Sequence, residues 1–368
     1  MKRMVSCFCF SCSVVLVLAQ AETEKEQAAE VPAVEVQQLS KSAYADKLED
    51  NVSKLVVNNQ NNNAWVNAYK AERYGNYSGT SRSISTDSQK KLDFMVSEMN
   101  THIPNTFEFH YASYLNGNKS TDALSHLQQA HTLNPSSTEL HDDMLANAVI
   151  EKNESEKKDF AQKLSEGKVY SGAELEYNRN VLASVSVGAV LITYGNVDTY
   201  PLIISQEVNG LRKDIKIVCL DWLGSSAYRD QVAVDCGVAK NKITSSASLS
   251  LAEILAGSPK KIFVALTLPP NELKKYADKL YLTGLALMYS NQSQSNLPDL
   301  ASKWEVYFSK THLADNEALN RNYILPLIQL SAYYDDTGQP DKKKTVDDLA
   351  KQLALSTTNP SKVNQYLD

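Results

Sequence analysis

The chain has 368 residues, of which 43% are hydrophobic and 22% charged, and its 43 acidic residues exceed its 37 Lys and Arg residues, giving a net charge of −6. This length and apolar content allow two domains with cores of their own and exclude wholesale disorder. Without a basic excess the chain lacks the main source of affinity for phosphate backbones, so a nucleic-acid partner is excluded. After the first segment, no apolar run approaches the roughly 20 residues that a membrane helix needs.

The first residues have the pattern of an export signal. Lys2 and Arg3 form a basic head, an apolar stretch runs from Val5 to Ala19, and Ala19-Gln20-Ala21 supplies small residues at the positions that signal peptidase reads. We therefore expect residues 1–21 to be a signal peptide and the mature protein to be periplasmic. A lipoprotein is the weaker alternative, because no Leu-small-small run precedes a cysteine at the end of the apolar stretch.

Residues 22–42 lack helical periodicity and are expected to form a flexible acidic spacer. From residue 43 the sequence becomes helical, and Tyr44, Leu48, Val52 and Leu55 share one apolar stripe. A loop rich in Gly and Ser follows Gly75, and Asp87 is expected to cap the next helix. We expect this helical region to extend to residue 182.

One helix pair in this region carries a specific resemblance. The segment 122–135 resembles the second helix of a tetratricopeptide repeat, with Ala123, Leu127, Ala130 and Pro135 at the small, large, small and proline positions. An aromatic first helix precedes it. The resemblance implies stacked helix pairs with a concave groove, a surface that such repeats use for binding. The aromatic side chains expected to line that groove are Trp65, Tyr69, Tyr111 and Tyr114.

The residue pattern changes near residue 183. Short β-branched runs at 190–194, 215–220 and 261–266 alternate with helical stretches, the pattern of a parallel sheet covered by helices. We expect a small α/β domain over 183–290, with three or four mostly parallel strands. The chain then returns to helices resembling repeats over 291–368. The predicted fold is therefore mixed and mainly α, with helical repeats flanking a small α/β domain.

Two stretches of this α/β region, 194–210 and 261–286, are familiar in combination. With their Tyr-Gly-Asn-Val-Asp-Thr-Tyr-Pro-Leu loop and Phe-Val-Ala-Leu strand, they resemble the soluble C-terminal region of a Bacteroidota-type, protein O-mannosyltransferase-like family of membrane glycosyltransferases. The resemblance covers roughly residues 180–350. In that family the transferase chemistry belongs to a multi-spanning membrane part, which these residues do not include, so the resemblance implies no catalytic residue. Asn196 and Val197 also depart from the loop of the family.

The same loop is the best candidate for a ligand site. Ligands of open α/β sheets bind beyond the carboxyl ends of the strands, where two of the predicted strands place polar and aromatic residues. The alternative is structural: Asp198 or Thr199 caps the next helix, and Trp222 belongs to the core. We favour this structural interpretation, because polar loop residues usually serve turns and caps. The candidate ligand-binding residues are Gly195, Asn196, Asp198, Thr199, Tyr200, Asp221 and Trp222.

Other chemistry finds little support in the sequence. Cys219 and Cys236 either form a disulfide or lie separately as small buried side chains. The six histidines show no metal-ligand spacing, and no nucleophile elbow or other catalytic motif is present, so we expect no metal, no cofactor and no catalytic residue.

These observations predict an exported, non-catalytic adaptor that binds a protein partner in the cell envelope, beside its glycosylation or secretion machinery. Peripheral membrane association is compatible with this expectation. The rival hypothesis is an α/β domain that binds a glycan or a sugar nucleotide, or acts on it, with Asp198 as its acidic residue.

Overall fold

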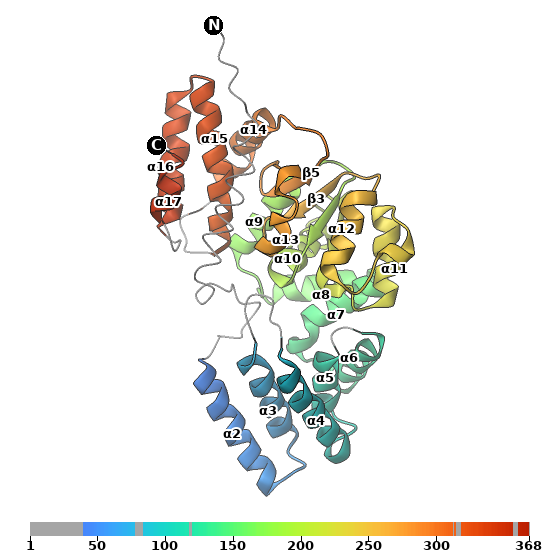
Figure 1. Cartoon of the computed structure of the whole chain (residues 1–368). Helices are drawn as coiled ribbons and strands as arrows, with labels where there is room; N and C mark the ends of the chain where they lie inside the picture. The colour runs from blue at the N-terminus through green and yellow to red at the C-terminus, as the bar shows by residue number, and fades with distance from the viewer. Residues whose placement is uncertain are drawn as a thin grey trace.

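The computed structural model describes residues 40–77, 84–117, 120–311, 313, 318–355 and 360–367. The predicted signal peptide, and the predicted spacer up to residue 39, lie outside the described residues. The predicted fold class is confirmed, because the protein is mainly helical and contains one small mixed sheet (Figure 1). Within the described ranges, no helix combines the length and hydropathy that crossing a membrane requires.

Helices fill the N-terminal half. They are α2 (Lys41–Val57), α3 (Asn62–Gly75), α4 (Thr86–His102), α5 (Phe107–Asn116), α6 (Thr121–Leu133), α7 (His141–Ile150) and α8 (Glu154–Glu166). In most of them a side chain caps the free N–H groups; at the start of α4 the Ser85 hydroxyl accepts from the Ser88 amide. The prediction that Asp87 caps this helix is therefore wrong, because the N-cap lies two residues earlier, at Ser85. Asp87 lies in the first turn, where a carboxylate stabilises the positive end of the helix dipole.

The α5–α6 pair confirms the predicted helices and the role of small residues between them. A Cβ on Gly117 would lie 2.6 Å from the Ala123 Cβ, so only glycine allows the two helices to meet there. Ala123, Leu127 and Ala130 are buried. The assignment of this pair to the tetratricopeptide repeats stays a prediction.

The sheet has five strands in the order β2-β1-β3-β5-β4. The strands are β1 (Val190–Thr193), β2 (Lys216–Cys219), β3 (Ile262–Ala265), β4 (Leu280–Leu282) and β5 (Ala286–Tyr289). As predicted, β1 pairs in parallel with β2 and β3; Val190 lies opposite both Lys216 and Ile262. Strand β5 pairs antiparallel with both β3 and β4. The β4–β5 hairpin was not predicted, so the sheet has five strands where three or four mostly parallel strands were expected. The strands of the hairpin are too short to show a period of two residues.

Helices cover both faces of the sheet. They are α9 (Gly172–Ser184), α10 (Asn196–Glu207), α11 (Ser226–Cys236), α12 (Ala247–Gly257) and α13 (Pro270–Lys274). Because β2 and β3 flank β1, right-handed crossovers place α10 and the α11–α12 pair on opposite faces. The chain ends in α14 (Leu297–Val306), α15 (Ile324–Asp336), α16 (Pro340–Ala354) and α17 (Pro360–Asn364). The α15–α16 hairpin stands at the end of the molecule opposite α2 (Figure 1).

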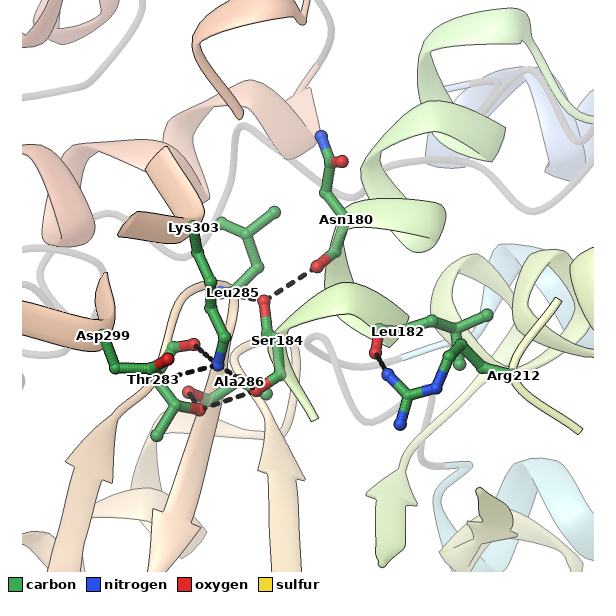
Figure 2. Close-up of polar contacts among 9 residues, drawn as sticks. All are labelled: Asn180, Leu182, Ser184, Arg212, Thr283, Leu285, Ala286, Asp299 and Lys303. Carbon is green, nitrogen blue, oxygen red and sulfur yellow. Dashed lines mark hydrogen bonds and ion pairs between the residues drawn. The ribbon is translucent and has the colours of Figure 1, made fainter. Parts of the chain in front are cut away.

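The C-terminal end of α9 is fixed to the β4–β5 turn (Figure 2). The Lys303 ammonium donates to the Ser184 carbonyl at 3.1 Å and to the Thr283 carbonyl at 3.0 Å, while the Ser184 hydroxyl accepts from the Leu285 amide at 2.8 Å. Arg212 donates to the Leu182 carbonyl at 2.7 Å. Two cations therefore donate to carbonyls of the last turn of α9, at the negative end of the helix dipole, in addition to the hydrogen bonds that these carbonyls accept from the Val185 amide and the Thr283 hydroxyl.

Candidate functional site

The predicted site lies where β1 and β2 end side by side. After β1 the chain turns at Gly195, whose φ of +88° is a conformation that glycine adopts readily, and enters α10 at once. After β2 it forms a short 3-10 turn, Leu220–Trp222. The two connections leave toward opposite faces of the sheet. The candidate residues therefore lie where the sequence placed them, beyond the carboxyl ends of two parallel strands, the edge at which open α/β sheets bind ligands.

Asp198 faces into the protein at this edge. Its side chain is 1% exposed, and its carboxylate accepts from the Tyr194 amide at 3.1 Å and from the Thr267 hydroxyl at 2.6 Å. The hydroxyl of Thr199 lies 3.3 Å from the other carboxylate oxygen and 2.8 Å from the hydroxyl of Thr193. These contacts join the end of β1, the first turn of α10 and the segment after β3. The carboxylate thus acts as an internal connector, and its protein partners occupy both oxygens.

Burial also changes the acidity of this group. Removal from water raises the pKa of Asp198 from 3.8 to about 6, although the hydrogen bonds from Thr267, Tyr194 and Thr199 act in the opposite direction. The free-energy cost of removing the charged carboxylate from water therefore exceeds the stabilisation that hydrogen bonds from its three donors provide.

Pro201 explains why α9 makes a side-chain contact with the start of α10. Proline has no N–H, so the carbonyl of Val197, four residues earlier in α10, lacks its helical donor. The Asn178 side-chain amide of α9 donates to that carbonyl at 3.0 Å. Asn178 also donates to the Glu174 carbonyl at 2.9 Å. The proline thus ties α10 to α9, and this role accounts for Asn178 being fully buried.

The remaining candidates divide between the edge and the core. Trp222 is 2% exposed and packs against the rings of Tyr200 and Tyr228, with centroids 5.7 and 5.6 Å away. Tyr194 is only partly buried; burial, with the charge and hydrogen bond of Asp221, raises its pKa to about 12. The structure therefore brings the candidate residues together, but turns Asp198, Tyr200 and Trp222 inward. Tyr194 and Asp221 remain at the surface.

The cysteines are separate side chains. Cys219 and Cys236 are both free and buried, so the disulfide alternative is wrong and the second alternative holds. Burial raises the pKa of each thiol to about 12, which leaves both unreactive as nucleophiles. In the part of the chain that the structure describes, no group of three His, Cys, Asp or Glu side chains is placed to hold a metal. His110 and His126 do meet, with their Nδ1 atoms 2.8 Å apart.

The predicted groove aromatics are buried, so their expected exposure is wrong. Trp65 is 9% exposed, and Tyr69, Tyr111 and Tyr114 are 0%, 6% and 2% exposed. Trp65 and Tyr69 belong to a small core between α3, α4 and α5, and the other two to the main core. Their spacing along helices fits a core as well as a groove, and here the core uses them.

The structure instead places a groove between α2 and α4. It holds about 670 Å³, and its lining residues are Leu48, Val52, Leu55, Val56, Asn59, Trp65, Glu72, Lys90, Lys91, Phe94, Met95, Glu98 and His102. Phe94 is 65% exposed and Val56 is 83% exposed. The apolar stripe of α2 is part of this lining: only Tyr44 is buried, while Val52 remains 45% exposed. We call this surface the α2–α4 groove. The exposure of Phe94 was not predicted, since the residue lies in the apolar run Phe94-Met95-Val96 that the sequence assigns to a packed helix.

Comparison with known protein families gives one match. Residues 174–288 match the family model described as TMEM260-associated domain 2. The match begins in α9, includes the sheet and covers less than half of the chain. It lies almost entirely within residues 180–350, the range of the resemblance described above to the soluble C-terminal region of a transferase family. No curated protein and no solved structure matches the chain.

Proposed function

We propose that this protein is an exported, non-catalytic adaptor that binds a protein partner in the cell envelope through the α2–α4 groove. The observation that carries the proposal is the exposed apolar lining of this groove, with Phe94 and Val56 facing solvent. Large exposed apolar patches rimmed by charges are typical of protein-interaction sites. The rim here carries Lys90 and Lys91 in one part and Glu98 in another.

The match to TMEM260-associated domain 2 supports a place beside glycosylation machinery. In this proposal the α/β domain and its neighbours attach the adaptor to that setting, while the N-terminal helices contact the partner. The rival function, direct binding of a glycan by Asp198, is less well supported. A sugar hydroxyl needs an accessible acceptor, whereas Asp198 is 1% exposed and engaged by internal donors.

The test is chemical crosslinking of the protein in native envelope extract, with the bound partners identified by mass spectrometry. The Phe94→Asp variant places a charge in the groove, and Leu249→Asp is the matched control, since Leu249 is a 61% exposed helical residue of α12. We expect one reproducible complex with the wild type and with Leu249→Asp, and its loss with Phe94→Asp. Recovery of the same complex with all three proteins would refute the groove as the contact surface.

A further inference from the structure

We propose that the partner seated on the α2–α4 groove is a second copy of this chain, paired with α4 antiparallel to α4 about a twofold axis at Phe94. This inference rests on the proposed function, because it names the partner of the same surface. It follows from the order of charges along α4 and from the exposure of the side chains between them.

The exposed face of α4 is self-complementary. Lys90 lies four residues before Phe94 and Glu98 lies four residues after it. Residues four apart share one face of a helix, and each charge lies about 6 Å along the axis from the phenylalanine. A twofold axis through Phe94 reverses the direction of the helix. It therefore brings Lys90 of each copy opposite Glu98 of the other, with the two phenylalanines between them.

The charged groups are available for such pairing. The Lys90 ammonium lies 3.5 Å from the Asp87 carboxylate, and its side chain is 73% exposed. The Glu98 carboxylate lies 3.7 Å from the ring nitrogen of His102 and is 37% exposed. Both contacts are longer than a hydrogen bond of ordinary length, so neither strongly competes with an ion pair across the interface.

The apolar part of the surface also fits a second copy. Phe94 is 65% exposed, and Val52 and Val56 of α2 line the other side of the groove. A phenylalanine from an antiparallel α4 enters this space beside Phe94 and covers the valines, which no other described helix covers. Such an isologous contact uses the same patch on both copies and closes at a dimer.

The experiment measures the molar mass of the full chain by light scattering at increasing concentration, and uses two charge reversals. In Lys90→Glu, each interface carries two Glu–Glu contacts, and in Glu98→Lys it carries two Lys–Lys contacts. We expect the wild type to reach twice the monomer mass, and each variant alone to dissociate with a dissociation constant raised about tenfold or more. An equimolar mixture of the two variants pairs Glu with Lys at both contacts, so we expect the mixture to dimerise again.

Recovery in the mixture separates loss of pairing from loss of folding, because a misfolded variant is not rescued by another. A wild type that stays monomeric at tens of micromolar overturns the inference, as does a mixture no more dimeric than its components. These results leave the proposed function testable by itself. If envelope crosslinking still depends on Phe94 while the chain is monomeric, the adaptor proposal stands and its partner is a different protein. If the chain is monomeric and envelope crosslinking does not depend on Phe94, both proposals fail.

Discussion

Replacement of the buried carboxylate in Asp198→Asn should change how stability depends on pH. The pKa of Asp198 is about 6 in the folded protein against an ordinary 3.8, so the folded state holds the proton more tightly than the unfolded state. Stability from this group is therefore fully present below about pH 4 and falls as the pH rises to about 6. A difference of about two pKa units corresponds to about 3 kcal/mol of unfolding free energy.

The asparagine variant lacks this titration while keeping an oxygen that can accept from the Tyr194 amide. We expect it to match the wild type at acidic pH and to gain about 3 kcal/mol over it between about pH 4 and pH 7.5. The assay is urea unfolding of both proteins across this range. Asp214→Asn is the control, because hydrogen bonds from Arg212 lower the pKa of Asp214 to about 2, so its effect has the opposite sign.

Two results would refute this reasoning. A difference between the proteins that stays constant with pH would show that Asp198 is ionised at ordinary acidity. A variant that is less stable at neutral pH would show that the charge stabilises the fold. Envelope crosslinking should be unchanged in Asp198→Asn. If the carboxylate instead bound a glycan directly, the Asp198→Asn variant would lose glycan binding.

Three further substitutions test the packing around α9 and α5. Gly284→Ala should lower the free energy of unfolding by about 2–4 kcal/mol, because φ is +126° and the new Cβ would lie 2.3 Å from the Ser184 hydroxyl oxygen. Chemical unfolding measures this, and an unchanged stability would contradict the close approach. Lys303→Met should cost about 1–3 kcal/mol, since the Thr283 carbonyl loses the Lys303 ammonium and the Ser184 carbonyl keeps the Thr283 hydroxyl but loses its charged donor; an unchanged melting temperature would show that water replaces the ammonium. Tyr114→Phe removes the hydroxyl that donates to Asp143 and should cost about 1–2 kcal/mol by urea unfolding, with no loss being the contrary outcome.

The elements with strong local signals were predictable. The first three strands followed from β-branched runs, and the α5–α6 pair from its alanines and aromatics, because burial imposes those residue types on short segments. The β4–β5 hairpin was not predicted, since strands of three and four residues are too short to show a recognisable pattern of alternation. Its turn depends on Gly284, whose role arises from contact with Ser184, a hundred residues earlier.

The candidate site was predictable in place but not in orientation. Spacing along the chain put Asp198 and Trp222 at the carboxyl edge, which depends on topology alone. Whether a side chain points to solvent depends on Thr267 and Tyr228, whose approach is a tertiary property. The same limit applies to Trp65 and Tyr69, because a core and a groove select the same aromatic spacing. Phe94 is the converse case, an aromatic in an apolar run that remains 65% exposed.

The most direct test of the central claim is site-specific photocrosslinking in cells from position 94. A benzophenone amino acid replaces Phe94 in one protein and Leu249 of α12 in the control, and the products are sized and identified by mass spectrometry. The account predicts one discrete adduct from position 94, at twice the chain mass if the partner is a second copy, and none from position 249. Absence of an adduct from position 94, or equal adducts from both positions, would contradict the claim that the α2–α4 groove is a protein-binding surface.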